Sequence, residues 1–119
     1  MAQVYALSVG DNSDSLSEFK KELENDHKEN LIYAMDEAIR MLQLHGFQIN
    51  TKWKRESLKK LDTELFELRQ KNIRLLLYYD GKDFFIILHC FLKTTQQTPK
   101  KEIERAKKEI KRWKETKQD

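Results

Sequence analysis

The stretch FFIILHCFL, residues Phe84–Leu92, constrains the fold of this chain more than any other. Both of its alternating sets of side chains are largely apolar, which is typical of a strand that is covered on both faces. The run is too short to cross a bilayer, since a membrane-spanning helix needs about 20 apolar residues. The pattern therefore predicts an interior strand of a sheet, and this strand ends abruptly at Lys93.

Three further strands are predicted from short runs of β-branched, aromatic or alternating residues. They are Val4–Val9, Glu64–Arg69 and Ile73–Tyr79. The dipeptide Asp80-Gly81 directly follows the third run, and such a dipeptide is a strong signal for a two-residue hairpin turn. The last two strands are therefore expected to pair as a hairpin.

Helix starts are predicted at two capping boxes, Ser15–Glu18, with Ser15 as the N-cap, and Asp26–Glu29. Gly46 suits the end of the second helix, and the two helices are expected to form an antiparallel hairpin. A last helix begins at Pro99, with Thr98 as its N-cap. Its narrow apolar stripe is formed by Ile103, Ala106, Ile110 and Trp113.

The predicted order is β-α-α-β-β-β-α, which is that of a single α+β domain over residues 1–119. It predicts a small, mainly antiparallel sheet with an N-terminal helical hairpin and a C-terminal helix. We expect the helices mainly on one side of the sheet, so that the other side is partly open. Residues 48–62 show no clear period and are predicted to be a basic loop.

The net charge of +3 hides an uneven distribution of charge along the chain. Residues 1–51 carry 4 basic and 9 acidic side chains, whereas residues 93–119 carry 10 basic and 5 acidic ones. A basic second half favours a surface that meets an anionic partner, although lysine-rich helices that are merely soluble explain it equally well. The single cysteine, Cys90, is expected to pack as a small apolar residue in a cytoplasmic protein without a signal peptide.

With a two-residue turn at Asp80-Gly81, alternation places one set of side chains on a single face of the sheet. This set comprises Arg74, Leu76, Tyr78, Phe85, Ile87, His89 and Phe91, with Arg74 opposite Ile87 and Leu76 opposite Phe85. Arg69 lies opposite Arg74 if the preceding turn is centred on Lys71-Asn72. We expect the Arg74 guanidinium on the open part of this face, bordered by Lys93, Lys100 and Lys101.

Such a cluster of cations, tyrosine and histidine suits the cleavage of RNA, which carries its own nucleophile, the 2′-hydroxyl. Guanidinium and ammonium groups stabilise the charge of the phosphorane, while a tyrosine or histidine moves protons or stacks on a base. Each side chain also has a structural explanation. The arginines can pair with Glu67 or Asp83, His89 can be a hydrogen-bonded core residue, and Tyr78 can be ordinary strand packing. No metal or cofactor is expected, because cysteine pairs and a glycine-rich phosphate loop are missing from the sequence.

About fifty residues, Leu65–Trp113, resemble the RelE/ParE superfamily of type II toxins, and most closely its phage-derived, HigB-like branch. The motifs are ELR at Glu67–Arg69, the IR…YYDG hairpin, LHCFLKTTQQTP at Leu88–Pro99, and the helix KKEIERAKKEIKRW. The resemblance implies a RelE-like fold and an endoribonuclease that cleaves mRNA, in many members during translation on the ribosome. It also implies a helix-turn-helix (HigA-like) antitoxin as the partner.

The resemblance further implies a set of catalytic residues, and the basic loop outside the matched stretch adds residues that are expected to bind RNA. The catalytic set is Arg69, Arg74, His89, Lys93, Lys100 and Tyr78. The RNA-binding set is Lys52, Lys54, Arg55, Lys59, Lys60 and Lys101. The chain departs from the family at Lys93-Thr94-Thr95, where many members read Lys-Lys-Thr, so one cation is missing there.

Two other functions remain compatible with the sequence. Relatives of the ParE type share the fold but poison DNA gyrase and cut no RNA. A non-catalytic binding module of a phage regulatory complex is the other. The clustered arginine, tyrosine and histidine side chains favour the nuclease but do not decide against a gyrase ligand.

Overall fold

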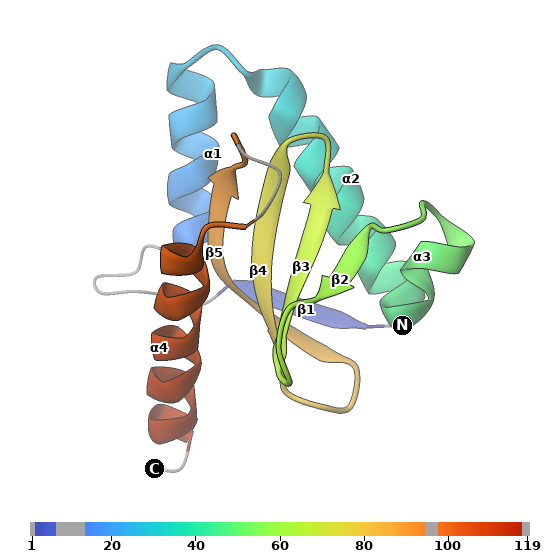
Figure 1. The fold of residues 1–119 in the computed structure, drawn as a ribbon. Coiled ribbons are helices and arrows are strands. Elements are labelled where there is room, and N and C mark those ends of the chain that lie inside the picture. The colour runs from blue at the N-terminus through green and yellow to red at the C-terminus, as the bar shows by residue number, and fades with distance from the viewer. Residues whose placement is uncertain (1, 7–13, 95–97, 118–119) are drawn as a thin grey trace.

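The computed structural model describes residues 2–6, 14–94 and 98–117 (Figure 1). The helices are α1 (Ser15–Asn25), α2 (Glu29–His45), the 3₁₀ turn η1 (Gly46–Gln48), α3 (Ile49–Lys52) and α4 (Lys100–Lys117). The strands are β1 (Gln3–Ala6), β2 (Leu58–Lys60), β3 (Leu65–Gln70), β4 (Ile73–Tyr79) and β5 (Phe84–Leu92). The α+β class predicted from the sequence is confirmed. Within the described residues, no helix has the length and apolar character that crossing a membrane requires.

The strands form one mixed sheet in the order β1-β5-β4-β3-β2. Strand β1 runs parallel to β5, and the other neighbours are antiparallel. The apolar strand β5 lies between β1 and β4, so its predicted interior position is confirmed. The described part of the first strand ends at Ala6, and residues 7–9 of the predicted strand lie outside the described residues.

The prediction of a basic loop over residues 48–62 is wrong, because this segment contains α3 and the edge strand β2. The side-chain amide of Asn50 donates to the carbonyl of Leu58 and accepts from its backbone N–H, both at 2.8 Å. At the start of β2, the Asn50 side chain thus makes the two backbone hydrogen bonds that a neighbouring strand would otherwise make. The exposed side chains of Lys59 and Lys60 then mark this edge of the sheet, where charged residues oppose unwanted strand pairing.

The predicted pairing of β4 with β5 is wrong by several residues. Tyr79 pairs with Phe85, because the loop between the strands is longer than two residues and both Lys82 and Asp83 have positive φ angles. A β-bulge between Leu76 and Leu77 shifts the register once more. As a result, Arg74 lies opposite Phe91 and Leu76 lies opposite His89, instead of opposite Ile87 and Phe85.

The bulge also changes which residues of β5 face each side of the sheet. Phe85 and Ile87 belong to the core beneath α1 and α2, so their predicted place beside Arg74 is wrong. Ile86 and Leu88 face α4 instead. The prediction that His89 and Phe91 share a face with Arg74, Leu76 and Tyr78 holds, although Tyr78 pairs with Ile86 farther along the hairpin.

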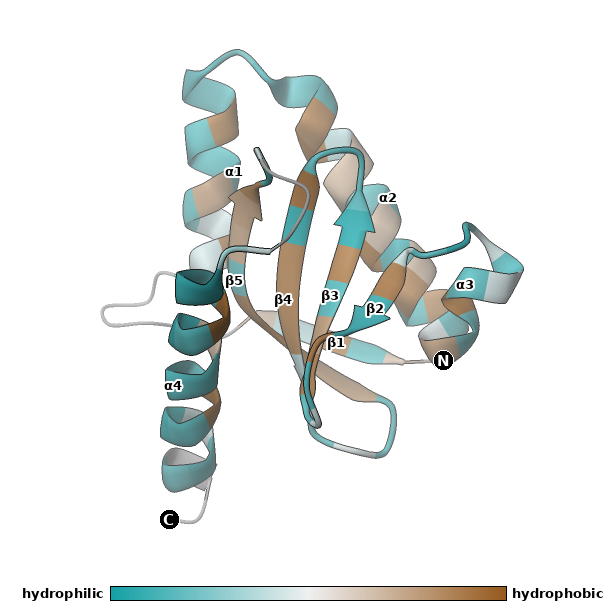
Figure 2. Cartoon of the chain, viewed as in Figure 1, coloured by the Kyte–Doolittle hydropathy of each residue, from teal (hydrophilic) through white to brown (hydrophobic). Residues whose placement is uncertain are grey.

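Helices cover both faces of the sheet, which corrects the expectation that they pack mainly on one side (Figure 1). Phe19 and Leu23 of α1 and Met35 and Leu42 of α2 are buried against one face. The predicted stripe of α4 packs on the other face, with Ala106 and Ile110 buried and Ile103 and Trp113 partly buried. Figure 2 shows this apolar side of α4 turned toward the sheet, while its remaining surface is hydrophilic. Among the described residues, α4 covers the β4–β5 part of this face, and no helix lies over its β2–β3 part (Figure 1).

The helix ends differ in detail from the predicted caps. Asp14, and not Ser15, caps α1, because its carboxylate accepts the backbone N–H of Ser17 at 2.7 Å. The residue before α2 is Lys28, which makes no side-chain capping bond, so the predicted cap at Asp26 is wrong. Gly46 ends α2 with a φ of 55°, as its predicted role requires.

Candidate functional site

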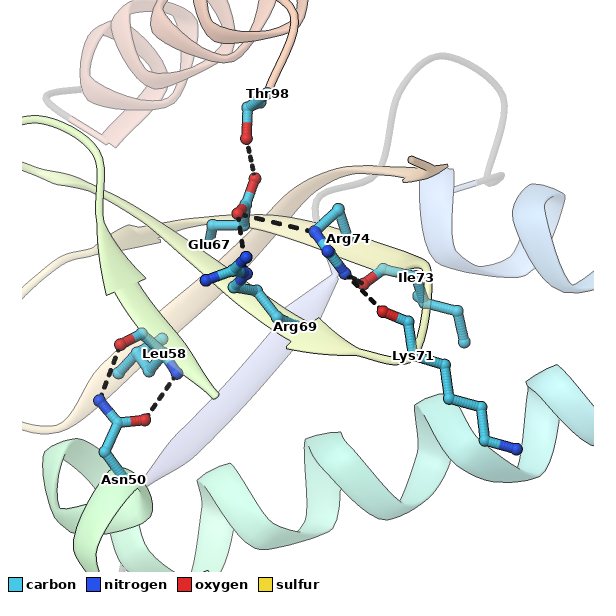
Figure 3. A network of polar contacts seen from close by, with 8 residues as sticks. All are labelled: Asn50, Leu58, Glu67, Arg69, Lys71, Ile73, Arg74 and Thr98. Carbon is cyan, nitrogen blue, oxygen red and sulfur yellow. Dashed lines mark hydrogen bonds and ion pairs between the residues drawn. The ribbon is translucent and has the colours of Figure 1, made fainter. Parts of the chain in front are cut away.

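Arg69 and Arg74 are direct cross-strand partners on β3 and β4, as the sequence predicted. Glu67 lies two residues before Arg69 on the same face, and its side chain is only 1% exposed. Its Oε1 lies 3.6 Å from Nε of Arg69 and 3.8 Å from Nε of Arg74 (Figure 3). A buried carboxylate therefore sits between two guanidinium groups, and we call Glu67, Arg69, Arg74 and Thr98 the Glu67 cluster.

Thr98 completes the Glu67 cluster from the segment that leads into α4. Its hydroxyl donates to Oε2 of Glu67 (Figure 3). The prediction that Thr98 caps α4, with Pro99 as the first helical residue, is wrong by one position: the helix begins at Lys100, and the carbonyl of Pro99 accepts the N–H groups of Glu102 and Ile103 at 3.0 and 3.3 Å. The hydroxyl of Thr98 is directed to the sheet instead, so one carboxylate holds two strands and the start of α4.

The Arg74 side chain is 9% exposed, so the expectation that its guanidinium lies on the open sheet face is wrong. Its Nη1 donates to the main-chain carbonyls of Lys71 and Ile73, both at 2.8 Å. These bonds fold the guanidinium over the β3–β4 turn. Desolvation lowers the pKa of Arg74, and the charge of Arg69 adds to this, although an arginine remains a cation in any case.

Arg69 is the more accessible arginine, with 26% of its side chain exposed. It lines a surface hollow of about 390 Å³ together with Asn50, Glu56, Leu58, Lys59 and Lys60. Within the described residues, its guanidinium donates no hydrogen bond. The N–H groups of Arg69 are thus available to a ligand at the uncovered side of the sheet.

Lys93 lies at the end of β5, where its backbone N–H donates to the carbonyl of Asn72 at 2.7 Å. Desolvation lowers the pKa of Lys93, the charges of Arg74, Arg69 and Lys59 lower it further, and Glu67 opposes them. Lys93 and Lys59 therefore belong to the electrostatic surroundings of the Glu67 cluster. Glu67 thus has two guanidinium groups within 3.8 Å and Lys59 as its cross-strand partner on β2, while Lys93 interacts with these groups through its charge. The excess of positive charge suits an anionic ligand.

His89 lies on β5 opposite Leu76, which separates it from Glu67 of β3, and it contacts the first turn of α4. Its Nε2 is 2.5 Å from Oε2 of Glu102, and both side chains are mostly buried. Its ring also stacks on Phe91. Desolvation lowers the pKa of His89, and the charges acting on it come from Glu102, Arg105 and Glu109 of α4 rather than from the two arginines.

Tyr78 lies at the opposite end of β4 from Arg74. Its hydroxyl donates to Asp80 at 3.0 Å, and Nζ of Lys114 lies 5.7 Å from the ring centroid. Burial, followed by the hydrogen bond to Asp80, raises the pKa of Tyr78 to about 12. The structure therefore does not bring Tyr78 together with the cations of the Glu67 cluster.

The remaining basic residues predicted to bind RNA fall into separate groups. Lys59 borders the Glu67 cluster, and Lys60 is its exposed neighbour on β2. Lys54 is directed elsewhere, because its Nζ donates to Gln70 at 3.0 Å and lies over the ring of Trp53. Four further cations have exposed side chains, in α3, the following loop and the first turn of α4: Lys52, Arg55, Lys100 and Lys101.

Two chemical alternatives can be assessed within the described residues. Cys90 is buried, and burial raises the pKa of its thiol to about 12, so it has the properties of a core residue and not of a nucleophile. In the same part of the chain, no group of three histidine, cysteine or acidic side chains is arranged to hold a metal ion.

The sequence interpretation did not assign a site role to Glu67, although a signal was present. In a strand, Glu67 and Arg69 necessarily share one face, since side chains alternate with a period of two. The contact of Glu67 with Thr98 was not predictable from that spacing, because Thr98 is 31 residues away in the sequence.

Fold and site together define a small α+β protein with a cationic site on one face of its sheet. The chain belongs to the family of phage-derived Gp49-like proteins (DUF891), whose family model matches residues 18–111. This family is of the RelE/HigB-like toxin type and is associated with the toxins of toxin–antitoxin systems. A search of curated proteins found no match to the chain.

Proposed function

We propose that this protein is the toxin of a type II toxin–antitoxin system and an endoribonuclease that cleaves mRNA during translation on the ribosome. The observation that carries the proposal is the accessible Arg69, which lies with Arg74 beside a buried carboxylate, within the electrostatic reach of Lys93. Membership of the Gp49-like family supports the toxin class. Within that class we place the chain in the HigB-like branch and its action in the cytoplasm, where translated messages are.

The proposed reaction uses the 2′-hydroxyl of the RNA as the nucleophile. Its oxygen attacks the adjacent phosphorus, the bond from phosphorus to the 5′-oxygen breaks, and a 2′,3′-cyclic phosphate and a 5′-hydroxyl result. A base takes the proton of the 2′-hydroxyl, and an acid gives one to the leaving oxygen. In this scheme Arg69 and Lys93 contact the phosphate and stabilise the phosphorane, since an arginine fork matches two phosphate oxygens.

His89 is the proposed proton carrier of the site. Its lowered pKa keeps the imidazole neutral near pH 7, and a neutral imidazole can accept a proton. Lys59, Lys60, Lys100 and Lys101 are proposed to follow the RNA backbone on either side. Tyr78 is left outside this reaction centre, because its hydroxyl is donated to Asp80.

The proposed partner is a small helix-turn-helix antitoxin of the HigA-like type, which relieves toxicity by binding the toxin. The acidic side chains of α1 and α2 make that hairpin a poor surface for RNA and leave it open to a protein partner. Hydrogen exchange of the toxin with and without its antitoxin would locate the contact.

The test is induced expression of the intact chain, with growth, protein synthesis and message integrity followed together. Arrested translation with cleaved messages, relieved by the co-expressed antitoxin, is the expected result. Damaged DNA with intact messages would instead identify a gyrase poison. Normal growth with a folded product would leave only a binding module.

A further inference from the structure

We propose that Glu67 is a positioning residue, which sets the orientation of Arg69 and thereby the rate of cleavage without touching the RNA. The inference rests on the proposed function, since it concerns the same site. It assigns a role to the most deeply buried charged side chain of the site.

The distances from the Glu67 carboxylate to the two arginines explain how Glu67 can orient Arg69 and still leave its N–H groups able to bind a phosphate. Its Oε1 lies 3.6 Å from Arg69 and 3.8 Å from Arg74, which is beyond the range of a good hydrogen bond. The attraction is therefore mainly one of charge, and it is strong because the carboxylate is shielded from water. Glu67 therefore holds the guanidinium of Arg69 in place without accepting a good hydrogen bond from it.

The two arginines differ in how firmly other contacts hold them. Arg74 is fixed independently by its two bonds to the carbonyls of Lys71 and Ile73. Arg69 has no such anchor within the described residues, and its direct cross-strand neighbour carries the same charge. Like charges placed opposite each other repel, so loss of the carboxylate would displace Arg69 and leave Arg74 nearly in place.

The second oxygen of Glu67 links this arrangement to α4. It accepts the hydroxyl of Thr98, two residues before Lys100 in the first turn of the helix. The same carboxylate therefore also ties the segment just before α4 to the sheet. The proposed RNA contacts of Lys100 and Lys101 thus depend on Glu67 as well.

The experiment compares cleavage of a translated message by wild type, Glu67→Gln and the control Glu64→Gln. Glutamine keeps an oxygen for Thr98 but loses the charge, while Glu64 pairs with Lys114 outside the cluster. We expect Glu67→Gln to lower kcat about 10- to 100-fold, the range found for residues that orient metal ligands from the outer shell, with KM nearly unchanged. Glu64→Gln should leave both constants unchanged.

A double-mutant comparison separates positioning from a general loss of structure. If Glu67 acts through Arg69, Glu67→Gln should cause little further loss in an Arg69→Ala background. The same fold-loss in both backgrounds, or wild-type cleavage by Glu67→Gln, would overturn the proposal. Should Glu67→Gln fail to fold, Glu67→Asp keeps the charge and should retain most of the cleavage, whereas a loss as large as that of Arg69→Ala would contradict positioning.

A spectroscopic measurement keeps this proposal distinct from the proposed function. The NMR cross-peak of Arg69 Nε–Hε should shift in Glu67→Gln and stay in place in Glu64→Gln. An unshifted cross-peak in Glu67→Gln refutes positioning, even if the wild type cleaves RNA. A wild type that cleaves no RNA refutes the proposed function, while the shift still reports the orientation of Arg69.

Discussion

Arg69 and Arg74 face each other directly across β3 and β4, and the same carboxylate oxygen of Glu67 lies within 3.8 Å of both. Two like charges in this position destabilise a sheet unless an opposite charge lies between them. Their placement is therefore costly without Glu67. Since only Arg69 is accessible, the two arginines should respond differently to substitution.

Arg74→Ala is expected to destabilise the protein. The substitution removes two hydrogen bonds and leaves the carbonyls of Lys71 and Ile73 without this donor, which costs about 1–3 kcal/mol. Urea unfolding measures the loss, with the exposed Arg40→Ala on α2 as a control expected to stay within about 0.5 kcal/mol of wild type. Equal stability of the two variants would contradict the structural role of Arg74.

The lowered pKa of His89 leads us to expect a specific dependence of stability on pH. Burial lowers its pKa below the ordinary value of 6.5, so in acid the unfolded chain binds this proton more readily than the folded one. The contribution of neutral His89 to stability is therefore present above pH 6.5 and is lost as the pH falls through the folded-state pKa. Urea unfolding between pH 7.5 and pH 5 should show a smaller acid-induced loss in His89→Gln than in wild type.

The Glu102 carboxylate opposes this shift and supplies a direct check on the assignment. Because its charge raises the pKa of His89, Glu102→Gln should lower that pKa further, which an NMR titration of the imidazole measures. A pKa of His89 above 6.5 in the wild type would show that desolvation is not the dominant influence.

The attachment of α4 is expected to depend on its apolar stripe and much less on its ion pairs. Lys114 reaches both carboxylate oxygens of Glu64 at 2.7 Å, but both side chains are substantially exposed, so the pair is worth at most about 1 kcal/mol. Ile110 is buried, and Ile110→Ala should cost about 2–5 kcal/mol. Urea unfolding of Ile110→Ala and Lys114→Ala compares the two, and equal losses would contradict this ranking.

The edge strand β2 is predicted to contribute charge to RNA binding. Removing one phosphate contact from a single-stranded ligand lowers the slope of log K against log salt by about 0.7. Lys59→Ala should show this change because Lys59 borders the Glu67 cluster, whereas Lys28→Ala, before α2, should not. The measurement is the affinity for a short single-stranded RNA over a range of salt concentrations.

Much of the fold was predictable because its strands carry strong local patterns. The bounds of β4 and β5 agree with the sequence prediction, and the apolar stripe of α4 was found by its spacing. The register was not predictable, because it depends on the positive φ angles of Lys82 and Asp83 and on a bulge at Leu76. These features leave no local pattern in the sequence.

The pairing of the two arginines was predictable from the sequence, but the contacts that hold them were not. The pairing of Arg69 with Arg74 followed from one hairpin turn and is confirmed. The burial of Arg74 and the role of Thr98 depend on contacts between segments that are distant in sequence. Such contacts form only in the folded protein, so no local pattern in the sequence indicates them.

The most direct test of the proposed role of Arg69 in RNA cleavage compares wild type, Arg69→Ala and Arg40→Ala. Cleavage of a translated message and thermal melting are measured for each protein. Arg69 is expected to be a preorganised donor to the phosphorane, and loss of such a donor costs about 10²–10³ in rate. In Arg69→Ala, Glu67 keeps Arg74 and Thr98 as partners, and the repulsion between the two arginines is removed, so stability should change by no more than about 1 kcal/mol. Arg69→Ala is expected to lose cleavage while it keeps its melting temperature, and Arg40→Ala is expected to keep both. Cleavage by Arg69→Ala at the wild-type rate would contradict that role.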